Sequence, residues 1–427
     1  MQQVATRWFG LRRNLRGQYS PLFFLAALGN GGMAITFFIW LNFLIPHPKT
    51  PIVTFDSIAA FLNKANTFSY ALTIGAMAGI IIFALRHLRL VVWNLREYAQ
   101  YRRTPAYAAL RETNGAISLM SLPLTLAMTV NVFFVLGAVF VPGLWNVVEY
   151  LFPISLSVLT IIGVAAMRIF LDLFGRALAG GHFDCTRNNN LSQLQAAFTF
   201  AMVAVGLAAP AAMSDNRVTI AVSILLSIFF LGATALVGVI MLVLGFRGML
   251  AHGLAVEAAP SLWMPIPILT LVGIALIRIR HGLHHGFEVH IEPGSTFVLV
   301  GTILALQLLT GVIGYAVLRQ VGYLRTYLWG EARSPGSYGL ICPAVALFVF
   351  GMFFVHPGLV QNGLIEKYSL AHYLMIAPFA LVQALGIVAM LRLDGKLLRP
   401  QIETAASDAA TAAHPHTPAL DDPQLAD

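Results

Sequence analysis

Ten stretches of about 18 to 36 residues without any Asp, Glu, Lys or Arg are the strongest constraint on this chain. A helix needs roughly 20 apolar residues to cross the ~30 Å hydrocarbon core of a bilayer, and each stretch is about that long. The sequence therefore predicts an all-α polytopic membrane protein with ten transmembrane helices. The predicted spans are Pro21–Leu44, Phe68–Leu85, Ala116–Val141, Tyr150–Met167, Leu191–Met213, Val218–Leu244, Ser261–Ile277, Thr296–Leu318, Tyr338–Val355 and Tyr368–Leu391.

The basic residues predict the orientation of these spans. Of the 26 Lys and Arg residues, 20 lie in the two terminal segments and in the gaps that follow even-numbered spans. Cytoplasmic loops carry the excess of Lys and Arg, so both termini are predicted to be cytoplasmic. The other six residues are Lys49, Lys64, Arg217, Arg278, Arg280 and Lys367, all in gaps predicted to be external.

Composition supports a membrane location and excludes other classes. The chain is 58% hydrophobic and 10% charged, whereas about a quarter of the residues in soluble domains are charged. Its net charge of +8 reflects the orientation signal and contact with anionic lipid, so we expect no nucleic-acid partner. The first apolar run is too long for the core of a signal peptide, and we expect a transmembrane helix there. A bacterial inner membrane is the predicted location.

We expect one membrane domain with a soluble segment at each end. Residues 1–19 are basic and predicted to lie at the cytoplasmic surface, and residues 20–392 form the ten-helix domain. Residues 400–427 are rich in Ala, Pro and Asp, and too poor in large apolar residues to fold, so this cytoplasmic tail is predicted to be disordered. Short external gaps indicate that consecutive spans pair as five hairpins.

Proline and glycine suggest which spans are internal. Four odd-numbered spans contain proline within or at an end of the span, and the first has a Gly-Asn-Gly-Gly run instead, whereas Pro153 is at the start of an even span. Irregular backbone is tolerated in a bilayer where it packs on protein or lines a cavity, so the odd spans are predicted to form an inner ring. The alternative is that Pro and Gly are simply common in membrane helices.

Four segments of the chain resemble a known family, in the order in which that family has them. The segments are SPLFFLAALGNGGM from Ser20, NGAISLMSLPLTLAM from Asn114, FRGMLAHGLAVEAAPSLWMPIPILTLVGIAL from Phe246 and SPGSYGLICPAVAL from Ser334. Together they resemble the tellurite-resistance/dicarboxylate transporter family, which includes the plant slow-type anion channels. The resemblance spans roughly Ser20 to Leu391.

The resemblance implies a pseudo-fivefold ring of five hairpins around a central pore, lined by the odd-numbered helices. It also implies conduction or export of small anions and, in many members, a homotrimer with one pore per subunit. Two features depart from the family. Cys342 stands where a pore-plugging phenylalanine is common, and the fifth span lacks an early proline. These departures are compatible with a wider pathway, a different gate or another use.

Two groups of side chains carry open alternatives. Cys342 is interpreted as a small apolar filler, as a pore-lining thiol, or as a small residue in place of the plug. The predicted external run HGLHHGFEVHIE is either a solvated, pH-responsive loop or a metal site. Its candidate ligands are His281, His284, His285 and His290.

We therefore predict a channel or exporter for small anions such as chloride, nitrate, sulfite, tellurite or a dicarboxylate, and not an enzyme. The alternative is a redox or thiol/metal-handling protein that uses Cys342 and the external histidines. No cofactor is expected, because His356 and His372, both placed near the outer surface, do not suggest a haem site. The expected partners are small anions and the lipid bilayer. The residues predicted to line or shape the pore are Gly29, Gly31, Pro123, Pro265, Pro267, Cys342 and Pro343.

Overall fold

The computed structural model describes residues 10–181 and 183–400. The chain divides into two units, one formed by Arg13–Leu397 and the other by Met1–Arg12 with Leu398–Asp427. In the second unit, the Arg12 amide donates to the Leu398 carbonyl at 2.9 Å. Residues 1–9 of the predicted cytoplasmic surface segment and residues 401–427 of the predicted tail lie outside the described residues.

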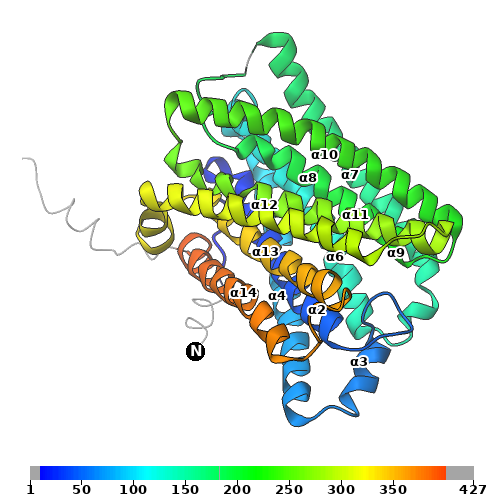
Figure 1. Cartoon of the computed structure of the whole chain (residues 1–427). Coiled ribbons are helices and arrows are strands. Elements are labelled where there is room, and N and C mark those ends of the chain that lie inside the picture. Colours follow the sequence, from blue (N-terminus) through cyan, green and yellow to red (C-terminus); the bar gives the residue numbers. More distant parts are fainter. Residues whose placement is uncertain (1–9, 182, 401–427) are drawn as a thin grey trace, which may run out of the picture. The chain divides into compact units, whose positions relative to one another are not determined.

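All regular structure in the described residues is helical, which confirms the predicted class (Figure 1). Ten helical segments, numbered here as spans 1 to 10, are long and apolar enough to cross a membrane. They are Pro21–Leu44, Thr67–Tyr101, Asn114–Phe140, Val148–Gly180, Ser192–Met213, Arg217–His252, Val256–Phe287, Gly294–Gln320, Pro335–Val360 and Leu370–Leu397.

Several spans continue beyond the predicted bounds. Span 2 reaches Tyr101 rather than Leu85, and span 4 reaches Gly180 rather than Met167. The prediction ended each span at its first charged residue, although a helix can continue into water with basic side chains on its surface. As a result Arg86, His87 and Arg278, assigned to gaps or helix ends, lie inside helices.

Every odd-numbered span is built from two or three helical elements, whereas every even-numbered span is one α-helix. Each odd span begins with 3₁₀ backbone and continues as an α-helix. The 3₁₀ segments are Pro21–Phe23, Asn114–Met120, Ser192–Leu194, Val256–Trp263 and Pro335–Leu340, followed by α2 (Phe24–Leu44), α6 (Ser121–Phe140), α8 (Gln195–Leu207) with α9 (Ala209–Met213), α11 (Pro265–Phe287) and α13 (Ile341–Phe353). The even spans contain α4 (Thr67–Tyr101), α7 (Val148–Gly180), α10 (Arg217–His252), α12 (Pro293–Gln320) and α14 (Leu370–Leu397).

The prolines of the odd spans mark these transitions and do not kink continuous α-helices. Pro123, Pro265 and Pro343 lie in the first turn of their α-helices, where the missing N–H has no helical partner to lose. The prolines inside long α-helices are instead Pro153 in α7 and Pro378 in α14, both in even spans. These three odd-span prolines therefore begin α-helices instead of interrupting them.

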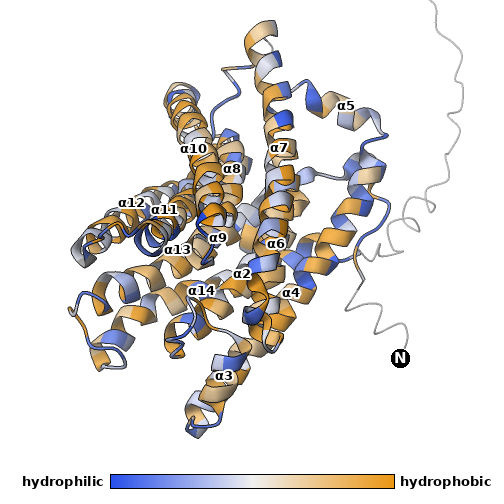
Figure 2. Cartoon of the chain, turned by 90° about the vertical axis from the view of Figure 1, so that its right-hand side faces the viewer, coloured by the Kyte–Doolittle hydropathy of each residue, from blue (hydrophilic) through white to orange (hydrophobic). Residues whose placement is uncertain are grey.

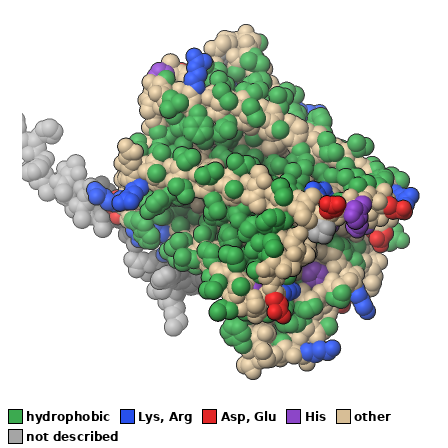
Figure 3. Space-filling model, in the orientation of Figure 1, with side chains coloured by type: hydrophobic (Ala, Val, Ile, Leu, Met, Phe, Trp, Pro, Cys, Tyr) green, Lys and Arg blue, Asp and Glu red, His purple; other side chains and the backbone are tan. Residues whose placement is uncertain are grey.

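The odd spans are more buried than the even spans. In the most hydrophobic window of each odd span, 83, 50, 89, 50 and 67% of the residues are buried, against 33, 28, 28, 28 and 22% in the even spans. Large exposed apolar side chains therefore cover the even helices, among them Phe68, Tyr150, Leu225, Val312 and Leu370. Figure 2 shows the hydrophobic residues along α7, α10 and α12, and Figure 3 shows an apolar face with charged side chains gathered toward its edges. Such a surface is suited to lipid.

The inner helices contact one another in a closed order. α2 packs on α6, α6 on α8, α8 on α11, α11 on α13, and α13 again on α2. Each even span packs on the odd span that precedes it, and the close pairs are α2 with α4, α6 with α7, α8 with α10, α11 with α12 and α13 with α14.

Glycines in α2 allow close approaches to α13 and α4. A Cβ atom at Gly29 would lie 2.9 Å from Ile341 of α13, and one at Gly31 would lie 2.8 Å from the His87 ring of α4. That ring is fully buried and its Nδ1 donates to the Ala27 carbonyl at 2.8 Å. Side chains at these positions would force the three helices apart.

An ion pair joins spans 1, 2, 9 and 10. Arg86 of α4 pairs with Asp394 of α14, and its Nε donates to the Asn30 side chain at 2.8 Å. Asp394 also accepts a hydrogen bond from Tyr338 at 2.8 Å. The Arg86 and Asp394 side chains are 35% and 13% exposed, so the carboxylate in particular depends on these partners.

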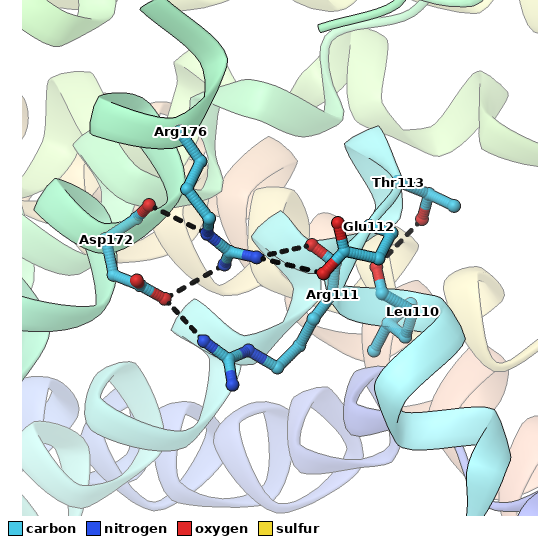
Figure 4. Close-up of polar contacts among 6 residues, drawn as sticks. All are labelled: Leu110, Arg111, Glu112, Thr113, Asp172 and Arg176. Atoms are coloured by element: carbon cyan, nitrogen blue, oxygen red, sulfur yellow. Dashed lines mark hydrogen bonds and ion pairs between the residues drawn. The ribbon is translucent and has the colours of Figure 1, made fainter. Parts of the chain in front are cut away.

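A more exposed cluster joins α7 to the short helix α5 (Pro105–Arg111) (Figure 4). Asp172 accepts hydrogen bonds from Arg111 at 2.8 Å and from Arg176 at 2.9 Å, and Arg176 also pairs with Glu112. Among the described residues, the ion pairs of Asp172 are with Arg111 and Arg176.

We predict that Asp394→Asn lowers the free energy of unfolding by about 2 kcal/mol, because it removes a charged acceptor and leaves Arg86 without its partner. Asp172→Asn is the matched control, with an expected loss below about 1 kcal/mol because its pairs are solvent-exposed. Reversible unfolding in mixed detergent micelles would measure both values. Equal losses would contradict the importance assigned to the Arg86–Asp394 pair.

Candidate functional site

A cavity of about 890 Å³ lies among the odd-numbered spans. Its lining comes from α2, α6, α8, α9, α11 and α13, from the π-helical end of span 9 (Phe354–Val360), and from the segments that follow spans 1, 7 and 9. Among the described residues, Thr296 of α12 is the single lining residue from an even span. The cavity is therefore enclosed by the most buried helices of the chain.

The two ends of the cavity differ in chemistry. The lining residues nearest the predicted cytoplasmic ends of spans 1, 3 and 5 are Leu28, Met128 and Phe198, and we call these three the floor. The opposite end, the mouth, includes His47, His281, His284, Gln361 and Lys367 from the predicted external side. An apolar floor below a polar mouth gives the cavity one end that favours water and one that does not.

The charge of the lining is of one sign. Arg278, Arg280 and Lys367 supply three positive charges, and no Asp or Glu is among the described residues that line the cavity. Four histidines, His47, His281, His284 and His356, are also part of the lining. Low-dielectric walls lined by one sign of charge concentrate ions of the opposite sign, so the electrostatics of this lining favour anions over cations.

Arg278 is held by backbone from a neighbouring span. Its Nη1 donates to the Val205 carbonyl at 2.7 Å. Val205 lies near the end of α8, just before the chain changes helix between α8 and α9. Among the described residues Arg278 forms no ion pair with a carboxylate, so its charge remains available to an anion in the cavity.

Burial lowers the pKa of two groups at the mouth, and one of them also feels the charge of the other. Burial lowers the pKa of the His47 imidazole below its ordinary value of 6.5, the hydrogen bond to the Ile45 carbonyl opposes this, and the charge of Lys367 lowers the pKa further. Burial also lowers the pKa of Lys367 itself. Burial, and to a lesser extent the charge of Lys367, thus favour the neutral form of His47.

The predicted pore residues are divided between the cavity and its surroundings. Gly29, Pro267 and Cys342 line the cavity. Gly31 faces Met128 and His87, whereas Pro123, Pro265 and Pro343 begin their α-helices without belonging to the lining.

The predicted metal ligands occupy the end of α11 and the turn after it. His284 contacts the Val289 carbonyl at 3.1 Å, and His285 contacts the carbonyls of His281 and Ser214. His290 lies beyond the helix and is exposed. Within residues 10–181 and 183–400, no three His, Cys, Asp or Glu side chains are grouped closely enough to hold a metal ion.

Sequence reasoning missed Arg278 as a cavity residue, because the predicted span ended at Ile277. A signal was present, since Gly282 and Gly286 continue a helical face with a four-residue spacing. In the structure both glycines are packed, and a Cβ at Gly282 would lie 2.6 Å from the Ala211 carbonyl oxygen. The contact between His356 and His372 had no local signal, because it depends on which faces of two spans meet.

No family model matches the chain, and no curated protein or solved structure matches it.

We predict that Lys367→Gln raises the pKa of His47, because it removes a nearby positive charge. His47 binds a proton less readily in the folded chain than in the unfolded chain. The free energy of unfolding therefore falls as the pH falls through the ordinary histidine range, and Lys367→Gln reduces this loss. NMR titration of the His47 ring would measure the pKa. Lys64 is an exposed lysine in the same gap as His47, between spans 1 and 2. Lys64→Gln is the control and is expected to leave the pKa of His47 unchanged. An identical His47 pKa in Lys367→Gln and wild type would contradict the coupling.

Proposed function

We propose that this chain is a membrane pathway for small anions, with the cavity as its external vestibule. The observation that carries the proposal is the lining itself, which has three fixed positive charges, four histidines and no carboxylate among its described residues. A pathway for cations would be expected to place acceptor groups with negative charge at such a mouth.

We further propose that the five inner helices surround a central pore, in the pseudo-fivefold arrangement of the tellurite-resistance/dicarboxylate transporter family. The closed order of contacts among α2, α6, α8, α11 and α13 supports this, as does the repetition of a 3₁₀ segment before an α-helix in all five odd spans. The excess of basic residues supports cytoplasmic termini. A bacterial inner membrane and a homotrimer are part of the same proposal, by resemblance to that family.

The floor is the proposed barrier to conduction. Leu28, Met128 and Phe198 come from three successive inner helices and offer an ion no polar side chain. A hydrophobic constriction blocks ions by excluding their water, and it opens when the surrounding helices move apart. Arg278, bound to the carbonyl of Val205 seven residues beyond Phe198 along α8, holds the anion on the mouth side of this barrier.

Flux through the purified chain in liposomes tests the proposal. With a chloride gradient and a clamped potential, we expect anion-selective flux. Replacing chloride by nitrate, sulfite or malate then ranks these anions as substrates. Arg278→Gln is expected to weaken the apparent affinity for chloride on the order of tenfold, since it removes a charge in a low-dielectric wall. Arg187→Gln, at an exposed arginine outside the cavity, is the matched control. No flux of any of these anions would refute the proposed function.

We predict that Cys342→Phe reduces flux severalfold, because Cys342 lines the cavity and a larger ring there narrows the pathway. Cys342→Ser is the control of similar size, and it is expected to conduct like wild type. The same liposome assay measures both variants. If Cys342→Phe conducts normally, position 342 is not at a narrow part of the pathway, and loss of flux in Cys342→Ser would favour a role for the thiol itself.

A further inference from the structure

Two buried histidines meet beside the cavity. His356 lies in a π-helical segment, Phe354–Val360, that ends span 9, and His372 lies in the first turn of α14. Their Nε2 atoms are 3.1 Å apart, and the residues are only 5% and 0% exposed. His356 belongs to the cavity lining. Ionisable residues inside a membrane domain, and π-helical turns, both occur preferentially at functional sites.

The hydrogen bonds determine which nitrogen atoms carry protons when both rings are neutral. His356 Nδ1 lies 3.0 Å from the Met352 carbonyl, which can only accept, so Nδ1 carries the hydrogen and Nε2 is an acceptor. His372 Nε2 must then donate to His356, which leaves His372 Nδ1 with a lone pair. That Nδ1 is buried and has no hydrogen-bond partner. The pair therefore has a single vacant proton acceptor.

The surroundings of the pair contain one fixed charge and no carboxylate contact. Phe43 of α2 stacks on His356 with ring centroids 4.5 Å apart, and α12 packs on the π-helical segment through Phe297. Tyr368 and Tyr373 lie beside His372. The positive charge of Lys367 interacts electrostatically with both histidines. Within the described residues, neither histidine forms an ion pair with a carboxylate. A protonated pair would therefore keep its charge without neutralisation by an acid.

We propose that His356 and His372 form a proton-binding site whose charge strengthens anion binding in the cavity. The inference rests on the proposed anion pathway and adds a second ion, the proton, to it. Occupancy of the two sites is linked, so a proton on the pair raises the affinity for the anion, and a bound anion raises the affinity for the proton by the same factor.

The proton moves along the two rings without any other reactant. A proton from water binds the lone pair of His372 Nδ1, and the hydrogen on His372 Nε2 transfers across the 3.1 Å contact to His356 Nε2. His372 is then neutral, with its hydrogen on Nδ1, and His356 is an imidazolium that donates to Met352 and to His372. The positive charge thus ends on the ring that lines the cavity.

Chloride dependence of flux in liposomes at external pH 8 and pH 5 tests this site. The half-saturating chloride concentration of wild type is expected to fall on the order of fivefold at pH 5, because one charge is added to the wall. His356→Gln and His372→Gln are expected to show little change with pH. His290→Gln, at an exposed histidine outside the cavity lining, is the control and is expected to respond as wild type does. A flat wild-type response, or a full response in His372→Gln, would overturn the inference.

A second measurement keeps the two proposals separate. Nitrogen NMR of the labelled wild-type chain in nanodiscs is expected to show hydrogen on Nδ1 of His356 and Nε2 of His372 at pH 8, and one additional proton on the pair at pH 5 in chloride. If the chain transports no anion at any pH, the proposed function fails, and this titration alone decides the proton site. A pair that remains neutral at pH 5 in chloride would refute it.

Discussion

The lack of hydrogen-bond partners in hydrocarbon is the constraint on which this architecture depends. A backbone N–H or C=O that faces lipid must be satisfied within its own helix, so lipid-facing spans are continuous α-helices. The even spans follow this rule and carry the exposed apolar side chains. The odd spans, which are shielded by protein, are the ones that begin with 3₁₀ backbone. The same requirement thus separates an outer layer of regular helices from an inner layer whose backbone can vary.

Charge is distributed between these layers in two different ways. Arg86 is matched by Asp394, Asn30 lies beside it, and the pair fastens four spans together on the predicted cytoplasmic side. Arg278 has a carbonyl as its partner instead of an acid, and it lies in the wall of the cavity. A paired charge stabilises the helix arrangement, whereas a charge without a counterion keeps its capacity to bind an external ion. The molecule therefore uses arginine both as a structural element and as the main source of the proposed selectivity.

The sequence predicted the parts of this structure that depend on local chemistry. The ten spans follow from their uncharged lengths, and three of the seven predicted pore residues, Gly29, Pro267 and Cys342, line the cavity. The ends of the spans were less accurate, because a charged residue does not end a helix that leaves the bilayer. The packing of helix faces could not be predicted, because a single sequence does not show which side of a span packs against which neighbour. Arg278 at the Val205 carbonyl and the His356–His372 contact both depend on that packing.

The close packing of α2 against α13 has a consequence for the biogenesis of the molecule. Gly29 and Gly32 fit against Ile341 and Val345, which the ribosome adds roughly 300 residues later. The helix α2, one of the most deeply buried, is therefore inserted early and remains in the bilayer without α13 for most of translation. During that time α4 can cover one side of α2, whereas the side that carries Gly29 and Gly32 faces lipid or a chaperone. The ring of inner helices closes only when span 9 enters the membrane, so the cavity is among the last features to form.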